Sequence, residues 1–69
     1  MTFGSTLANL RSERRISQAE LAGIAGVAQS TVSDIESGRI DPKVSTALKL
    51  LFALGVSLVE IWYEDGEVK

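Results

Sequence analysis

Between residues 29 and 34 the chain carries polar side chains whose types and spacing suit the recognition of base edges in DNA. Four of them lie at positions i, i+1, i+4 and i+5 and would share one side of a helix: Gln29, Ser30, Ser33 and Asp34. A glutamine amide can donate and accept in one plane, which matches N6 and N7 of adenine, and a serine hydroxyl can do either. A carboxylate only accepts, so Asp34 would favour the cytosine amino group and repel phosphates. With Val32 and Ile35 on its opposite side, this helix is predicted to enter the major groove.

A helix-turn-helix arrangement is expected to position this polar face. Ser17 and Glu20 form a Ser-x-x-Glu capping box, which predicts a helix starting at Gln18. That helix is expected to stop at Gly26, because glycine adopts positive φ without a Cβ penalty. The helix that carries the polar face follows after three or four residues and has Gly38 as its C-cap. So short a connection with a glycine at the corner lets two helices cross at a steep angle.

Two further helices are expected to flank this pair. Apolar residues at helical spacing predict a helix from Leu7 to Arg15, with Thr2 or Ser5 as its N-cap. Another is predicted from Val44 to Leu54, closed by Gly55. Four residues of that last helix are expected to face inward: Val44, Leu48, Leu51 and Phe52.

The C-terminal residues support two interpretations. Leu58, Ile61 and Trp62 would share one helical face after a capping box at Ser57, which favours a short fifth helix. Residues 56–63 are also rich in β-branched and aromatic side chains, so a strand that pairs with a second copy is the alternative. We expect a helix-turn-helix domain over residues 1–63 and an acidic tail over residues 64–69.

Composition limits what the chain can do. The 69 residues, 45% of them hydrophobic, suffice for a single core. There is no cysteine and no histidine, which removes disulfides, thiolate or imidazole metal sites and the common nucleophile and base pairs. We therefore expect no enzymatic activity, no cofactor and no metal. The absence of a long apolar run predicts no membrane partner and a cytoplasmic location.

The net charge of −2 is unusual for a protein expected to bind DNA. The charges are unevenly distributed: residues 1–43 carry five cations and five acids, whereas residues 44–69 carry two and four. The acidic excess thus lies in the C-terminal part. DNA binding stays compatible with this balance, but non-specific affinity is expected to be modest and sensitive to salt.

The chain resembles the lambda/434-repressor-like helix-turn-helix family, also called the Cro/C1 or XRE type. The resemblance rests on SQAELA from Ser17, AGVAQSTVS from Ala25, IESGR from Ile35, the proline at position 42, and LGVS from Leu54. It extends from about Leu7 to Trp62, nearly the whole chain. The resemblance implies an all-α fold, a compact domain of four to five helices.

The same resemblance implies roles for individual residues. Gln29 and Ser30 correspond to direct base readers, and Asp34 falls where family members often place a third. Gln18 corresponds to a phosphate anchor that also braces Gln29. Four further positions correspond to backbone contacts, with Lys43 also within reach of the minor groove: Ser17, Ser37, Arg39 and Lys43. The candidate DNA-binding residues are therefore Ser17, Gln18, Gln29, Ser30, Thr31, Ser33, Asp34, Ser37, Arg39 and Lys43.

Several of these side chains have structural alternatives. Asp34 could serve only to bond Thr31 or Arg39. In the family a cation at position 11 pairs with the acid at position 36, so we expect an Arg11–Glu36 ion pair. Arg14 and Arg15 are expected to be a solvated helix end that complements the macrodipole. Ala28 stands where serine or threonine commonly caps the recognition helix, a loss that typically costs about 1 kcal/mol.

A single recognition helix contacts few base pairs, each worth only about 1–3 kcal/mol. We therefore expect a homodimer that binds double-stranded DNA at a pseudo-palindromic operator, joined through the end of the last helix and residues 56–63. The leading function is a transcription repressor. The alternatives are a HipB-like antitoxin that binds DNA and a toxin partner, and a protein-interaction domain that no longer binds DNA.

Overall fold

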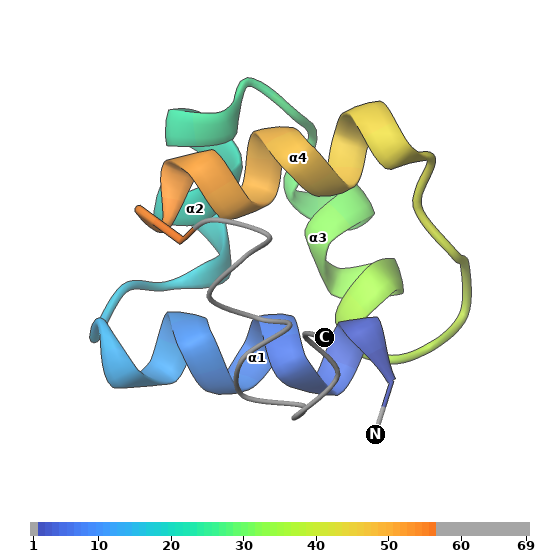
Figure 1. Cartoon of the computed structure of the whole chain (residues 1–69), viewed down its shortest axis with the longest axis horizontal. Coiled ribbons are helices and arrows are strands. Elements are labelled where there is room, and N and C mark those ends of the chain that lie inside the picture. Colours follow the sequence, from blue (N-terminus) through green and yellow to red (C-terminus); the bar gives the residue numbers. More distant parts are fainter. Residues whose placement is uncertain (1, 57–69) are drawn as a thin grey trace, which may run out of the picture.

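The computed structural model describes residues 2–56, which form four helices and no strand (Figure 1). The helices are α1 (Phe3–Glu13), α2 (Gln18–Ala25), α3 (Gln29–Glu36) and α4 (Val44–Ala53). The all-α prediction is confirmed over these residues. The expected fifth helix or strand lies outside the described residues, apart from Val56, as does the acidic tail. None of the four helices is long and apolar enough to cross a bilayer.

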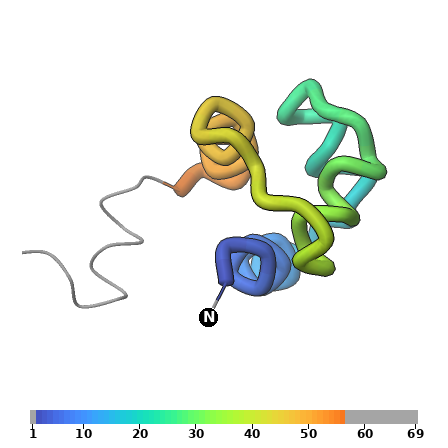
Figure 2. The backbone as a smooth tube through the Cα atoms, turned by 90° about the vertical axis from the view of Figure 1, so that its right-hand side faces the viewer, coloured from blue at the N-terminus to red at the C-terminus, as the bar shows by residue number. Residues whose placement is uncertain are grey.

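Helices α1 and α4 lie on one side of the domain and α2 and α3 lie on the other (Figure 2). Helix α2 packs against both α3 and α4, and α1 packs against α3. The side chains between them form one core, in which four residues are completely buried: Leu7, Leu21, Val32 and Leu50. Burial of each such side chain contributes about 1.5–3 kcal/mol to the stability of the folded chain, so packing of this core holds the four helices together.

Side-chain caps start two of the helices. The hydroxyl of Thr2 accepts the amide of Ser5 at 3.1 Å and so begins α1 four residues earlier than the apolar spacing predicted. At the start of α2, Ser17 Oγ accepts the Glu20 amide at 3.0 Å, and the Glu20 carboxylate accepts the Ser17 amide at 2.8 Å. This confirms the predicted capping box. Ala28 provides no side-chain cap to α3, also as expected.

All four helices end in the same hydrogen-bonded turn. In each turn, the amide of the residue that follows a left-handed residue returns to a carbonyl in the last turn of the helix, as in Val56 N to Leu51 O at 2.9 Å. Three of these turns place a glycine at positive φ, which confirms the predicted ends at Gly26, Gly38 and Gly55. The turn after α1 uses Arg15 instead, at φ 58°. The predicted helix to Arg15 was therefore too long, because α1 ends at Glu13 and Arg15 has left-handed geometry.

Substitution of Arg15 by glycine should stabilise the protein by about 0.5–1 kcal/mol. The left-handed conformation costs a residue with a Cβ about 1–2 kcal/mol, and the greater freedom of glycine in the unfolded chain offsets part of the gain. Urea unfolding measures the difference. Arg15→Ala is the control, since it removes the same side chain but keeps the Cβ and should show no gain. Equal stabilisation in both variants would trace the effect to the lost guanidinium.

Two side chains of α4 predicted to face inward do not. Val44 is 75% exposed and Phe52 is 76% exposed, whereas Leu51 is buried as expected and Leu48 is half-buried. The residues of α4 that enter the core are Leu50 and Leu51, followed by Leu54 at the cap. The helix carries two adjacent rows of apolar side chains, and its packing against α2 buries the row that contains Leu50, Leu51 and Leu54. Val44, Leu48 and Phe52, which follow one another at four-residue spacing, are called the α4 stripe below.

Candidate nucleic-acid interface

The structure exposes the polar side of α3 that the sequence singled out. Val32 and Ile35 are 0% and 1% exposed and anchor the helix in the core. Gln29, Ser30 and Ser33 are exposed to solvent. Two further candidates on the same helix, Thr31 and Asp34, are half-buried. The burial of one side of α3 therefore holds its other side, with a glutamine amide and two hydroxyls, toward solvent.

The residues expected to contact phosphates come from the start of α2 and from the loop between α3 and α4. Ser17, Ser37, Arg39 and Lys43 are exposed, and Gln18 is half-buried. The hydroxyl of Ser37 donates to the carbonyl of Asp34 at 3.1 Å, so this candidate already has a bond within the turn. Ser17 Oγ likewise accepts the Glu20 amide at 3.0 Å, and Arg39 Nη1 lies 3.5 Å from Asp34 Oδ1.

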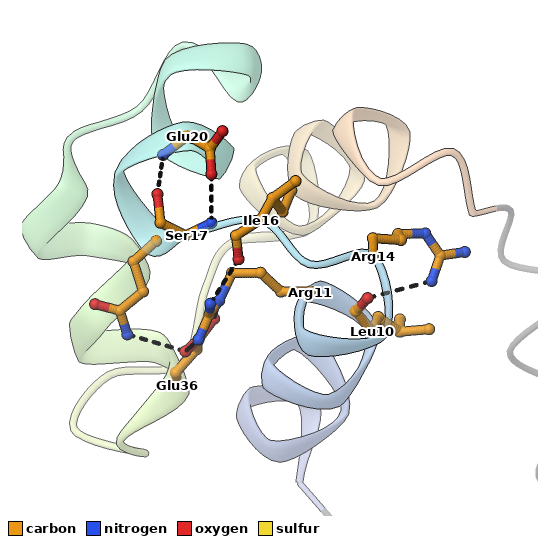
Figure 3. A network of polar contacts seen from close by, with 8 residues as sticks. Leu10, Arg11, Arg14, Ile16, Ser17, Glu20 and Glu36 are labelled. Atoms are coloured by element: carbon orange, nitrogen blue, oxygen red, sulfur yellow. Dashed lines mark hydrogen bonds and ion pairs between the residues drawn. The ribbon is translucent and has the colours of Figure 1, made fainter.

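A carboxylate joins three elements behind this surface. Glu36, whose side chain is only 7% exposed, accepts from Arg11 Nε at 2.8 Å and from Arg11 Nη2 at 3.0 Å. Arg11 Nη1 also donates to the carbonyl of Ile16 at 2.8 Å (Figure 3). The expected pair of Arg11 and Glu36 is confirmed. It fixes the C-terminal end of α3 to α1 and to the connection that leads into α2.

The structure gives the Gln18 side chain a hydrogen-bond partner other than Gln29, the residue that it was predicted to brace. The Gln18 side-chain amide donates to Glu36 Oε1 at 2.9 Å instead. A nearly buried carboxylate has more acceptor sites than one arginine fills, and the Gln18 amide fills another. Glu36 was assigned only to the pair with Arg11. The hydrogen bond from Gln18 to Glu36 depends on how α2 packs against α3, and no local sequence pattern indicates that packing.

The surroundings of the two ionised groups shift their titration. Burial alone would raise the pKa of Glu36, but hydrogen bonds from Arg11 and Gln18 and the charge of Arg11 together lower it below 4.5. The hydrogen bond with Glu36 raises the pKa of Arg11, against the opposing effect of burial. Both groups stay charged at neutral pH, so α3 keeps its anchor.

Asp34 and Arg39 form an ion pair at the exposed end of α3. Arg39 Nη1 lies 3.5 Å from Asp34 Oδ1, and the Arg39 side chain is 75% exposed. Of the two structural partners that the sequence left open for Asp34, the carboxylate meets Arg39.

Arg14 does not form the solvated helix end that was expected. Its Nε donates to the carbonyl of Leu54 at 2.6 Å and its Nη1 donates to that of Leu10 at 3.3 Å. The side chain is half-buried and links the end of α1 to the end of α4. Arg15, by contrast, is exposed as predicted. The partner of Arg14 lies 40 residues away in sequence, so only the folded chain reveals it.

Two short helices joined by a tight turn, with the second buried on one side and polar on the other, define a DNA-binding domain of the helix-turn-helix class. The family model described as Helix-turn-helix matches residues 7–61. The chain belongs to this family.

Similar proteins are named as regulators. The chain is 35% identical over 69 residues to the immunity repressor protein of Bacillus phage phi105, an alignment that covers 100% of this chain and 48% of the phage protein. It is 43% identical over 58 residues to the uncharacterized HTH-type transcriptional regulator y4dJ of Sinorhizobium fredii, covering 84% and 75%. The chain thus spans about half the length of the phage repressor.

A solved structure supports the fold. The restriction-modification controller protein C.AhdI from Aeromonas hydrophila superposes with a TM-score of 0.81 at 34% identity. The match covers 86% of this chain and 89% of that one. None of the three relatives is named as an antitoxin or as an enzyme.

Proposed function

We propose that the chain is a sequence-specific DNA-binding transcription regulator, without enzymatic activity, that acts in the cytoplasm as a repressor. The observation that carries the proposal is the solvent-facing polar side of α3, held outward because Val32 and Ile35 are buried behind it. In the complex, Gln29 and Ser30 contact base edges in the major groove, and Asp34 lies one turn further along. Repression follows when the bound protein blocks access of the polymerase.

The surrounding candidates hold the helix in register on the duplex. Arg39 and Lys43 contribute charge, whereas Ser17, Gln18 and Ser37 contribute hydrogen bonds to phosphates. Thr31 and Ser33 lie on the recognition helix itself and complete the surface. The phosphate contacts set the affinity for DNA and its salt dependence rather than the sequence preference.

Substitution of Gln29 by alanine should abolish recognition of one base pair in each half-site. Loss of a bidentate amide is expected to weaken operator binding by about 1–3 kcal/mol per half-site, while binding to unrelated duplex stays the same. Selection of bound sequences from a random duplex pool, followed by titration of the selected duplex at two salt concentrations, measures both effects.

Asn9→Ala is the matched control, because Asn9 is exposed on α1 and outside the proposed interface. It should leave the selected sequence unchanged. A wild-type protein that ignores duplex DNA at low salt would refute the proposed function. A Gln29→Ala variant that selects the same sequence with the same affinity as the wild type would contradict the assignment of Gln29 as a base reader.

We also propose a homodimer, because one recognition helix offers too few base contacts for useful specificity. The α4 stripe supports this proposal, since it places exposed Val44 and Phe52 on one side of α4. Val44 and Leu48 of the stripe also line an open groove of about 470 Å³, together with residues such as Phe3 and Pro42. The interface is proposed to combine the end of α4 with residues 56–63 and to place two α3 helices about one turn of DNA apart.

Phe52→Lys is expected to convert the dimer to a monomer. A lysine amine in an apolar interface is costly to desolvate, whereas the 76% exposed side chain of Phe52 contributes little to the core of its own domain. Sedimentation equilibrium should show a monomer, and thermal unfolding should stay cooperative, with a melting temperature lowered only by the stabilisation that dimerisation had given. Affinity for a palindromic duplex should fall far more than affinity for one half-site. Lys49→Ala, also exposed on α4, is the control. A dimeric Phe52→Lys variant would contradict the proposed interface.

A further inference from the structure

The backbone of the turn after α3 places Arg39 beside Asp34. The Asp34 carbonyl accepts the Arg39 amide at 2.9 Å, the Ile40 amide at 3.3 Å and the Ser37 hydroxyl at 3.1 Å. These bonds involve the main chain of Asp34 and leave its carboxylate free to pair with Arg39. The two side chains are therefore neighbours because of the turn geometry, and a change to either side chain leaves the other in place.

The Asp34 carboxylate is 34% exposed and lies on the solvent-facing part of α3, four residues after Ser30. In a helix this is about 6 Å along the axis, close to the spacing of two base pairs. A carboxylate has no proton to donate at neutral pH, so it needs a base that presents an amino group in the major groove. Adenine presents its amino group beside the N7 acceptor, which would repel a carboxylate, so an amino group without such a neighbour on the same base suits it better. The cytosine amino group meets this condition best.

A negative charge carried toward a duplex is repelled by the phosphates, and Arg39 offsets this repulsion. The guanidinium at 3.5 Å neutralises Asp34 locally, and its 75% exposure leaves it able to contact phosphate at the same time. An exposed pair of this kind contributes little to folding, which makes it easy to exchange for contacts with DNA.

We propose that Asp34 selects a cytosine at one position of each half-site and that Arg39 is the counter-charge that permits the carboxylate to enter the groove. This proposal rests on the proposed function, because it requires α3 to lie in the major groove. It goes further in assigning a base to one residue and in making Arg39 a partner of that residue as well as a phosphate contact.

The test compares the full-length wild type with Asp34→Asn, Arg39→Ala and the double variant, by selection from a random duplex pool and by titration of the selected duplex. The wild type should prefer cytosine at one position over the other bases by about 5- to 150-fold. Asp34→Asn should lose that preference, with a shift toward adenine because an amide both donates and accepts. The remaining positions of the selected sequence should not change.

The double variant tests the coupling. If Arg39 offsets the charge of Asp34, Arg39→Ala should weaken binding several-fold more in the wild-type background than in the Asp34→Asn background. Equal effects in both backgrounds would show that Arg39 contacts phosphate alone and would overturn that part of the proposal. Thermal unfolding of the variants provides a second readout, because a purely structural pair would change stability and leave base preference intact.

Failure of this inference is distinguishable from failure of the proposed function. If Gln29→Ala changes the selected sequence but Asp34→Asn does not, Asp34 reads no base and the inference is wrong, while α3 remains the recognition helix. If the wild type selects no sequence, the proposed function fails and the inference fails with it.

Discussion

Gly4→Ala is expected to destabilise the protein by about 2 kcal/mol or more. A Cβ at this position would overlap the carbonyl oxygen of Ile35 and would also lie 3.1 Å from its carbonyl carbon and 3.2 Å from Glu36 Cα. These are backbone atoms of α3, so no side-chain rotation can relieve the overlap. Helices α1 and α3 must move apart, and that loss exceeds the roughly 1 kcal/mol that alanine gains over glycine in a helix.

Gly23→Ala is the matched control for this prediction. Gly23 also lies within a helix, but a Cβ there would meet nothing within 4 Å, so the substitution should stabilise the protein by about 0.5–1 kcal/mol. Guanidinium unfolding of the two variants should give changes of opposite sign. If Gly4→Ala were as stable as Gly23→Ala, the close approach of α1 to α3 would not exist in solution. DNA affinity should also fall in Gly4→Ala, because the displaced residues belong to the recognition helix.

Glu36→Gln is expected to cost about 2 kcal/mol of stability at neutral pH. The substitution keeps the size of the side chain but removes the charge that binds Arg11 and replaces one acceptor with an amide donor. That donor would face the guanidinium or the amide of Gln18 in a site where the side chain is only 7% exposed. The partial exposure of Arg11, 20%, keeps the expected cost below that of a fully buried pair.

The pKa of Glu36 sets the pH dependence of this contribution. Because the folded-state pKa lies below 4.5, the stabilisation is fully present above about pH 4.5 and is lost as the pH falls through the folded-state value. Urea unfolding from pH 7 to pH 3 should show a steeper loss of stability for the wild type than for Glu36→Gln. Glu13→Gln is the control, since Glu13 is 70% exposed and lies 3.7 Å from Arg14. If Glu36→Gln lost stability as steeply as the wild type, this role would be contradicted.

Local signals in the sequence determined the helix-turn-helix and the polar side of α3. The Ser17–Glu20 capping box placed the start of α2 correctly, and glycines marked the ends of α2, α3 and α4. The helical spacing of Val32 and Ile35 predicted which side of α3 is buried and which side faces solvent. Each of these features depends on residues within about one helical turn of each other, so the chemistry of neighbours is enough to infer it.

Only the folded chain decided how the helices meet. The sequence could not distinguish the α4 stripe from the buried side of α4, since both are apolar and the outcome depends on the position of α2. The partner of Arg14, the bond from Gln18 to Glu36 and the need for glycine at position 4 likewise join residues that are distant in sequence. Such contacts follow from the relative placement of whole helices, which packing of the complete core determines and which no local pattern encodes.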